Sequence, residues 1–217
     1  MPTNSKLFPH GLKGVIFDCD GVMIDSRDAN RIFYNRVLAH FGLPPMTPDQ
    51  EKYSFMATGR QALEHIVPPP LHGQIDHVTS KVVNYRRDIT PLLRLQPGFR
   101  EFIEYLHTCG IRMSIATNRV EKGIQTVLDF FALPNYFNPV VTASNAKPKP
   151  SPEGGLRICA DWGVAPGDVL FIGDSEHDLA AARGAGIVFA AFGDTALHGR
   201  IAATDFDGLK QTLASIF

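Results

Sequence analysis

Short apolar runs recur along the chain, and most of them are closed by a turn residue or an acid. The runs are rich in β-branched and aromatic residues and are apolar on both faces, as in strands of a parallel sheet that is covered by helices. They therefore predict buried strands, which we place at residues 12–17, 111–116, 140–142, 169–172 and 187–192.

Amphipathic segments alternate with these runs after residue 96. Their apolar residues recur every three or four positions, which is typical of helices that bury one face. Regular alternation of helix and strand predicts a doubly wound, Rossmann-like α/β fold with a mostly parallel sheet and right-handed crossovers. The predicted helices lie at residues 99–109, 121–131, 152–162 and 178–183.

The alternation is interrupted between the first strand and Pro97. Helical patterns occur there at residues 29–41, 59–66 and 75–87, without a convincing strand. A direct crossover needs far fewer residues, so we interpret residues 28–95 as an inserted all-helical domain. Residues 1–27 and 96–217 would then form the α/β core.

Composition narrows the choice of partners. The chain has 217 residues, with 21 Lys and Arg against 22 Asp and Glu, a formal net charge of −1. This balance gives no support for a nucleic-acid or membrane-surface partner, and no apolar stretch approaches the roughly 20 residues of a membrane span. The oligomeric state stays open.

The three cysteines are far apart in sequence. Cys19, Cys109 and Cys159 form neither a CxxC pair nor an even-numbered disulfide framework. We interpret them as buried free thiols, and this favours a cytoplasmic location because thiols stay reduced there.

Polar residues follow three of the predicted strands, at the point where each strand ends. Ligands of open α/β sheets bind outside the carboxyl ends of the strands, so we expect these side chains to converge. They are Asp18 and Asp20 after the first strand, Thr117 and Asn118 after the second, and Asp174 and Asp178 after the fourth, with Lys149 preceding the helix that leads to the fourth strand.

Convergent carboxylates indicate a particular chemistry. They repel one another unless a cation joins them, and a set of oxygen ligands suits Mg²⁺ together with a phosphorylated substrate. A carboxylate can attack phosphorus, while a second carboxyl, as in the Asp18–Asp20 pair, can donate a proton to the leaving oxygen. The alternative is that the pair forms a turn and a helix cap. Asp205–Gly208 repeats the same DxDG pattern without a preceding strand, and there we expect Asp207 to cap a helix.

Four motifs carry a family resemblance. Residues 15–22, which read VIFDCDGV, resemble the first motif of the haloacid dehalogenase-like hydrolase superfamily. Residues 114–118, 149–152 and 173–178 resemble its second, third and fourth motifs, in the expected order. The chain is most similar to the phosphoglycolate phosphatase and β-phosphoglucomutase group, whose members carry a helical cap after the first motif.

The resemblance implies a role for each matching catalytic residue. Asp18 would be the nucleophile that becomes an aspartyl phosphate, and Asp20 would act as general acid and then as general base. Thr117 and the backbone N–H of Asn118 would bind the transferring phosphoryl group. Lys149 would neutralise the charge between the nucleophile and that group.

The resemblance also implies a Mg²⁺ site. Asp18 and Asp174 would bind the metal ion directly, and Asp20 would contribute its backbone carbonyl. Asp178 would hold either a metal-bound water or Lys149.

Several positions near these motifs leave alternatives open. Lys147 also begins a KPxP pattern, but Lys149 has the spacing to the acidic motif that the family uses. Val22 stands where phosphatases of this group often have Thr, which weakens an assignment to phosphoglycolate specifically. Arg60 in the insertion resembles residues that meet the distal part of the substrate, although an exposed arginine at a helix start is an equal alternative. Arg119 could aid the binding of an anionic substrate and His177 could contact substrate, but we expect each to be a solvated residue at a helix start.

The resulting expectation is a Mg²⁺-dependent phosphatase that acts on a small phosphorylated metabolite. A sugar phosphomutase similar to β-phosphoglucomutase is the alternative, because it would use the same aspartyl phosphate with a different acceptor. A non-catalytic phosphate-binding protein is the third hypothesis, and the presence of every motif residue disfavours it.

Overall fold

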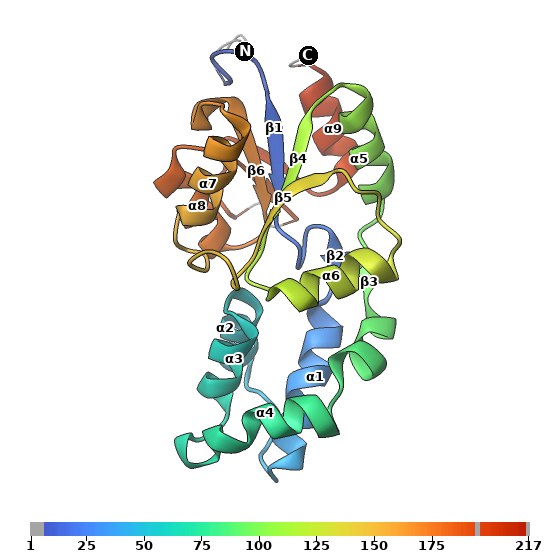
Figure 1. The fold of residues 1–217 in the computed structure, drawn as a ribbon, viewed down its shortest axis with the longest axis vertical. Coiled ribbons are helices and arrows are strands. Elements are labelled where there is room, and N and C mark those ends of the chain that lie inside the picture. The colour runs from blue at the N-terminus through green and yellow to red at the C-terminus, as the bar shows by residue number, and fades with distance from the viewer. Residues whose placement is uncertain (1–6, 194–195, 216–217) are drawn as a thin grey trace.

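A six-stranded sheet forms the centre of the computed structural model, which describes residues 7–193 and 196–215 (Figure 1). The strand order is β5-β4-β1-β6-β7-β8, and every neighbouring pair is parallel. The doubly wound fold is therefore confirmed. The strands are β1 (Gly14–Phe17), β4 (Arg112–Ala116), β5 (Phe137–Val141), β6 (Val169–Gly173), β7 (Val188–Phe192) and β8 (Ile201–Ala203).

All five predicted strands are present, one of them displaced, and one strand of this sheet was not predicted. The weakest prediction, at residues 140–142, falls late, because β5 already begins at Phe137. The short β8 was not predicted from the sequence. Its three residues acquire their strand conformation by pairing with β7, and that pairing is a long-range contact.

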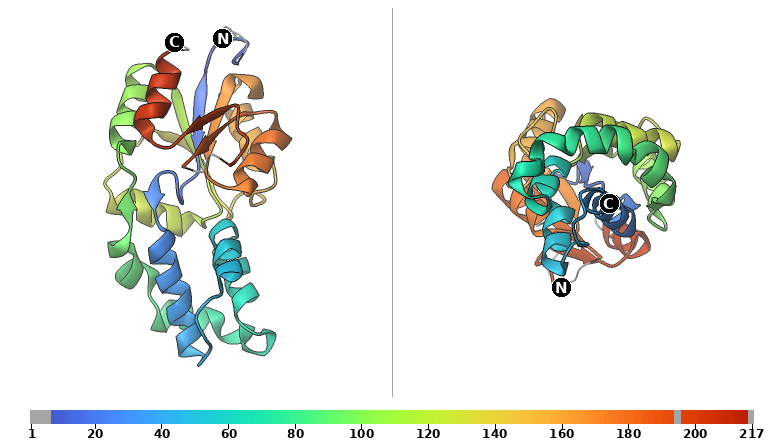
Figure 2. Two further views of the ribbon diagram at one scale, coloured as in Figure 1. Left: turned by 180° about the vertical axis from the view of Figure 1, so that it is seen from behind. Right: turned by 90° about the horizontal axis from the view of Figure 1, so that it is seen from below.

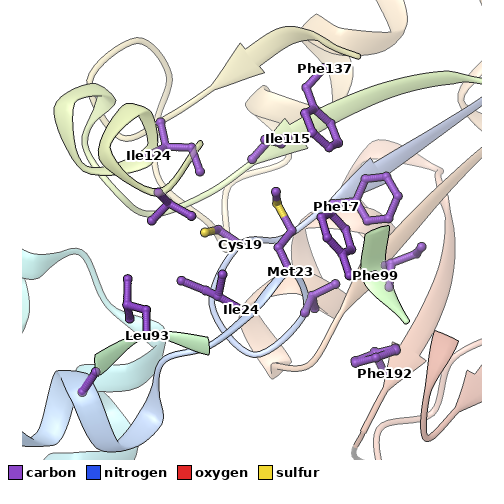
Figure 3. Packing of buried hydrophobic residues seen from close by; sticks show 14 of the residues in the cluster. Phe17, Cys19, Met23, Ile24, Leu93, Phe99, Ile115, Ile124, Phe137 and Phe192 are labelled. Atoms are coloured by element: carbon purple, nitrogen blue, oxygen red, sulfur yellow. The ribbon is translucent and has the colours of Figure 1, made fainter. Parts of the chain in front are cut away.

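The central strand β1 is buried on both faces. Val15 and Phe17 belong to the apolar core on one side of the sheet, and Ile16 belongs to the core on the other side. The Phe17 ring meets the rings of Phe99 and Phe137 edge to face, at centroid distances of 5.6 and 6.0 Å (Figure 3). This packing fixes the end of β1, from which Asp18 continues.

Helices cover both faces of the sheet. In Figure 1, α5 and α9 lie on one side and α7 and α8 on the other. The four predicted helices of the core are confirmed, although α8 is longer than expected. The prediction that Asp207 caps a helix was wrong: Asp205 caps α9, where its side chain accepts a hydrogen bond from the Gly208 N–H. In the described part of the chain, no helix has the length and apolarity that a bilayer crossing requires. The helices of the core are α5 (Phe99–Thr108), α6 (Glu121–Phe130), α7 (Glu153–Trp162), α8 (Glu176–Ala185) and α9 (Phe206–Ala214).

The insertion lies beyond the carboxyl edge of the sheet as two arms that meet at α4 (Figures 1 and 2). One arm contains α1, and the other contains α2 and α3. The predictions at residues 29–41 and 59–66 are confirmed. Helix α2 was not predicted, because its only buried residue is Ser54 and it carries no apolar stripe. The helices are α1 (Arg27–His40), α2 (Pro48–Met56), α3 (Gly59–Ile66) and α4 (Ile75–His77).

The prediction of one helix over residues 75–87 was wrong. Three α-helical residues are followed by a π-helical turn, η3 (Val78–Val82), and by a second one, η4 (Tyr85–Ile89). The backbone is extended at Val83, and the Asn84 side chain accepts a hydrogen bond from the Arg87 N–H. Asn84 therefore caps a new turn, because its short polar side chain competes with the helical backbone.

A short ribbon borders the insertion. Strand β2 (Ile24–Asp25) pairs antiparallel with β3 (Arg94–Leu95), so the chain leaves the core and returns to it side by side. The expectation of an insertion without a strand was therefore wrong at β3, which forms only by pairing with β2; the other regular elements within residues 28–95 are helical. We retain the division into residues 28–95 and residues 1–27 with 96–217 as a proposal, some of whose residues (1–6, 194–195 and 216–217) lie outside the described ranges.

The three cysteines are free thiols, but they differ in exposure. Cys19 and Cys159 are buried, as the sequence predicted. The prediction was wrong for Cys109, which is exposed because it follows the last residue of α5, where the chain turns at the surface.

Candidate active site

Strands β1 and β6 are neighbours, so the residues that follow them leave the sheet at the same edge. Asp18 directly follows β1, and Asp174 directly follows β6. Asp178 lies one helical turn into α8. Each of these three residues offers a carboxylate oxygen within 4.8 Å of the others. The structure therefore brings together acids from two motifs that are more than 150 positions apart.

Lys149 supplies the positive charge among these carboxylates. Its Nζ lies 2.6 Å from Asp18 Oδ1 and 2.6 Å from Asp178 Oδ1. The Lys149 side chain is 9% exposed, whereas Lys147 is an exposed residue. The choice of Lys149 over Lys147 is therefore supported by geometry as well as by spacing.

One ammonium group does not balance three carboxylates. Burial, followed by repulsion from Asp178, raises the pKa of Asp18 to about 7, although Lys149 acts in the opposite direction. Burial and the negative charges of Asp178 and Asp18 raise the pKa of Asp174 to about 8. These shifts reflect a surplus of buried negative charge, which a divalent cation would remove.

The Asp174 carboxylate also has an unused acceptor. Its Oδ1 is buried and accepts no hydrogen bond from any described residue. Its Oδ2 lies where a side chain at Gly21 would stand, because a Cβ there would be 1.9 Å away, and Gly21 has a positive φ of 83°. A glycine is thus required for this approach. A hard cation with oxygen ligands, such as Mg²⁺, fits this donor set.

Asp178 is held by the start of its own helix. Ser175 caps α8, and both its N–H and its hydroxyl donate to Asp178 Oδ2, at 3.1 and 2.5 Å. The other carboxylate oxygen accepts from Lys149. Of the two roles that the resemblance allows, these contacts favour holding Lys149.

The loop after β4 supplies Thr117 and Asn118. Thr117 is buried and lines the cavity that also contains Asp18 and Lys149. The Asn118 side chain accepts from the Lys149 N–H at 2.8 Å and donates to the Lys149 carbonyl at 3.0 Å. Asn118 Nδ2 also donates to the carbonyl of Met56, in the insertion, at 2.9 Å. The motif implies a role only for the backbone N–H of Asn118, so this bracing by its side chain was not predicted from the sequence.

A separate network surrounds Asp20. Arg119 Nε and Nη2 donate to the two carboxylate oxygens, each at 2.7 Å, and Ser26 and Asn30 also donate to Asp20 Oδ1. Burial acts to raise the pKa of Asp20, but the charge and hydrogen bonds of Arg119 outweigh it and hold the pKa below its usual value. The network continues into the insertion, because the Tyr85 hydroxyl lies 3.0 Å from Arg119 Nη2.

The expectation of a solvated Arg119 was therefore wrong. Its side chain is 11% exposed, because its partner is an acid that lies 99 positions earlier in the chain. His177 is half-buried rather than solvated, and its Nδ1 lies 3.1 Å from the Met56 carbonyl oxygen. Sequence patterns contain no sign of either contact, since both partners are distant in the chain.

Arg60 stands apart from the carboxylate cluster. It lines the same cavity, but its guanidinium pairs with Glu64 at 2.7 Å and with Asp76 at 2.9 Å. The side chain is 48% exposed. Its partners belong to the insertion, so the structure gives Arg60 no contact with the residues that follow the strands.

A family model, curated proteins and solved structures all match this chain over most of its length. A family model described as haloacid dehalogenase-like hydrolase matches residues 15–192. Phosphoglycolate phosphatase 1 of Pseudomonas aeruginosa is 29% identical over 215 residues, covering 92% of this chain and 78% of the relative. A subfamily IA hydrolase of the haloacid dehalogenase superfamily from Geobacter sulfurreducens superposes with a TM-score of 0.74 at 33% identity, covering 93% and 96% of the two chains. CbbY from Rhodobacter sphaeroides, solved with xylulose-(1,5)bisphosphate, shares the fold with a TM-score of 0.74 at 19% identity, covering 90% and 95%.

Proposed function

Because the chain belongs to the haloacid dehalogenase-like hydrolase family, we propose that it is a Mg²⁺-dependent phosphatase that releases phosphate from a small organic phosphomonoester through a phosphorylated Asp18. Its curated relatives include phosphoglycolate phosphatases, so monoester hydrolysis is the reaction that the similarity supports. The proposal assigns catalytic roles to Asp18, Asp20, Thr117 and Lys149.

The single observation that carries the proposal is the cluster of Asp18, Asp174 and Asp178 around one ammonium group. Two buried carboxylates and the half-buried Asp174 share a single cationic partner, which is costly in a folded protein unless further positive charge is present in the working state. A phosphatase of this kind needs such a charge to receive the phosphate dianion. The unpartnered Asp174 Oδ1 supports the same conclusion.

In the proposed first step, Asp18 Oδ attacks phosphorus. A bond forms between the carboxylate oxygen and phosphorus while the bond from phosphorus to the ester oxygen breaks. Lys149 offsets the negative charge that accumulates between the carboxylate and the phosphoryl oxygens. Thr117 and the Asn118 N–H orient those oxygens for in-line transfer.

Asp20 would act as the general acid of the first step and as the general base of the second. It donates a proton to the leaving ester oxygen, so that an alcohol departs, and later takes a proton from the water that attacks the phosphorylated Asp18. Phosphate leaves, and the Asp18 carboxylate is regenerated. Both carboxylate oxygens of Asp20 accept from Arg119 in this structure, so one of those contacts must break before Asp20 carries a proton.

Asp18, Asp174 and the backbone carbonyl of Asp20 would hold Mg²⁺. When bound, the ion would neutralise the carboxylates and the substrate phosphate, which lets two anions approach each other. Asp178 would act through Lys149, whose orientation it fixes.

The test is phosphate release from a panel of phosphomonoesters by the native chain and by Asp18→Asn. The native protein should release phosphate only when Mg²⁺ is present, and the variant should be inactive while keeping its circular dichroism spectrum. Normal turnover by Asp18→Asn would contradict the proposal. Conversion of β-glucose 1-phosphate into glucose 6-phosphate, instead of free phosphate, would identify a phosphomutase.

A further inference from the structure

The cavity at the candidate active site extends well beyond the residues that would handle the phosphate. Its volume is about 690 Å³, and its lining runs from Asp18 and Asp174 at the sheet edge to Ile75 and Thr79, near the junction of the two arms of the insertion. Sites for drug-sized ligands measure about 300–1,000 Å³. A two-carbon leaving group would fill only a small part of this space.

The insertion touches the core on both sides of the cavity, so the cavity is not simply the gap of a detached domain. At one side, the Met56 carbonyl accepts from Asn118 Nδ2 at 2.9 Å and lies 3.1 Å from His177 Nδ1. At the other side, Tyr85 meets Arg119 at 3.0 Å. The volume therefore belongs to an arrangement in which the insertion and the core are already in contact.

Aromatic rings line the cavity from both arms. Phe33, Tyr34 and Tyr85 form a contiguous set, in which the Phe33 ring lies 5.2 Å from the Tyr34 ring and 5.3 Å from the Tyr85 ring. Phe55 lines the cavity from the arm of α2, and the guanidinium of Arg27, at the start of α1, lies 4.5 Å from the centre of its ring. Aromatic faces on two sides favour a planar ring between them, since offset and edge-on ring contacts add to the gain from burial.

Ser54 adds an unsatisfied polar group to this apolar lining. It is the buried residue of α2 and lines the cavity, and its hydroxyl has no hydrogen-bond partner in the described part of the chain. A buried hydroxyl without a partner is destabilising, so a ligand that supplies the missing partner gains affinity. Asn84 also lines the cavity, and because its side-chain oxygen already accepts from the Arg87 N–H, only its amide N–H groups remain for a ligand.

The charges of the lining exclude a cationic leaving group. Apart from the carboxylate cluster, the acids of the lining are Asp20 and Asp76, which are paired with Arg119 and Arg60. No negative charge is therefore free to bind an amine. Arg86 and Lys122 also line the cavity. The lining therefore combines aromatic rings, hydrogen-bonding groups and two cationic side chains, which complement an uncharged heteroaromatic ring whose π face can meet a cation.

Resting on the phosphatase activity proposed above, we propose that the preferred substrate is the phosphomonoester of an alcohol that bears a heteroaromatic ring, and that this ring occupies the cavity between the two arms with a polar atom on Ser54. A nucleoside 5′-monophosphate and pyridoxal 5′-phosphate share this chemistry. They differ in the distance between the phosphate and the ring.

The first experiment compares kcat/KM for four substrates in Mg²⁺. Uridine 5′-monophosphate and pyridoxal 5′-phosphate test the two ring positions, glucose 6-phosphate is a bulky non-aromatic control, and 2-phosphoglycolate is the two-carbon control. We expect one ring-bearing substrate to exceed both controls by about tenfold or more. A preference for glucose 6-phosphate or 2-phosphoglycolate would overturn the inference while leaving the phosphatase intact. Absence of phosphate release from all four would instead contradict the proposed function.

The second experiment tests Ser54 directly. Ser54→Ala should raise KM for the preferred ring-bearing substrate by about three- to tenfold, the equivalent of one lost hydrogen bond, with little change in kcat. Its kcat/KM for 2-phosphoglycolate should stay within about twofold of the native value. An equal loss on both substrates would overturn the inference.

Two further variants serve as controls. Thr79→Trp fills the far end of the cavity and should impair only the ring-bearing substrate. Lys52→Ala changes an exposed residue of α2 outside the cavity lining and should change neither substrate. If Thr79→Trp leaves the ring-bearing substrate unaffected, the ring does not extend between the arms.

Discussion

The guanidinium of Arg119 forms a bidentate ion pair with the carboxylate of Asp20, with both N···O distances at 2.7 Å. Bidentate pairs of this kind fix orientation as well as charge. The Arg119 side chain is 11% exposed and the Asp20 side chain 17%, so solvent screens the pair weakly. Because Arg119 also meets Tyr85, the proposed general acid is connected to the insertion.

Arg119 is predicted to position Asp20. Arg119→Leu should lower kcat by about ten- to a hundredfold for an alkyl phosphate, whose leaving oxygen needs a proton from a correctly oriented acid. The loss should be smaller for p-nitrophenyl phosphate, since p-nitrophenolate departs without protonation. Steady-state kinetics on both substrates measure the difference. Tyr85→Phe removes the contact with Arg119 and the hydrogen bond that the hydroxyl donates to Asn30, but leaves the Arg119–Asp20 pair in place, so it should have a milder effect. Equal losses on the two substrates would argue against positioning.

Asn118 is predicted to brace the segment that carries Lys149. Asn118→Ala removes two hydrogen bonds to the Lys149 backbone and one to Met56, and we expect kcat/KM to fall by about tenfold because Lys149 loses its fixed position. His177→Ala removes only a contact with Met56 and serves as the comparison. If both variants lose the same activity, the contact with the insertion, not the bracing of Lys149, is the important one.

Asp174 is predicted to destabilise the metal-free protein. Above pH 8, the raised pKa of Asp174, the native side chain is ionised, and Asp174→Asn removes one of three neighbouring negative charges. In EDTA at such a pH the variant should therefore unfold at a higher temperature than the native chain, by the equivalent of roughly 1 kcal/mol. Mg²⁺ should raise the melting temperature of the native protein and leave that of the variant unchanged. Calorimetry with and without Mg²⁺ tests both statements, and an equal response of the two proteins to Mg²⁺ would remove Asp174 from the metal site.

Asp168 offers a stability prediction far from the cavity. It is buried and accepts from the His10 N–H at 2.9 Å, with the His10 ring also 2.9 Å away. Burial acts to raise the pKa of Asp168, but the contacts with His10 dominate and lower it. A lowered folded-state pKa means that the stabilisation is present above the unfolded value of about 4 and is lost as the pH falls through the folded one.

Asp168→Asn should therefore unfold more easily than the native chain at pH 7, by about 1 kcal/mol. The difference should shrink as the pH is lowered from about 4, where the native carboxylate begins to take up its proton. Denaturant unfolding at several pH values measures this trend. A difference that stays constant down to the acid range would show that the carboxylate charge is not involved.

Local patterns were sufficient for most of the core. The apolar run at residues 169–172 is closed by Gly173 and Asp174, and β6 occupies almost the same residues. Residues 99–109 carry their apolar stripe at helical spacing and are followed by Gly110, and α5 matches them closely. Local patterns failed where a segment depends on its neighbours. They did not predict β8, and they predicted one helix over residues 75–87, where the structure has several short turns.

The sequence by itself determined where most strands and helices of the core lie, that a helical segment interrupts their alternation, and which polar residues follow each strand, because periodicity and turn residues act locally. Only the tertiary structure decided that Arg119 pairs with Asp20, that the Asn118 side chain spans from Lys149 to Met56, and that Ser54 faces a cavity without a partner. These contacts join residues that lie far apart in the chain. Their geometry depends on how helices and strands pack against one another, and the periodicity of a single segment does not determine that packing.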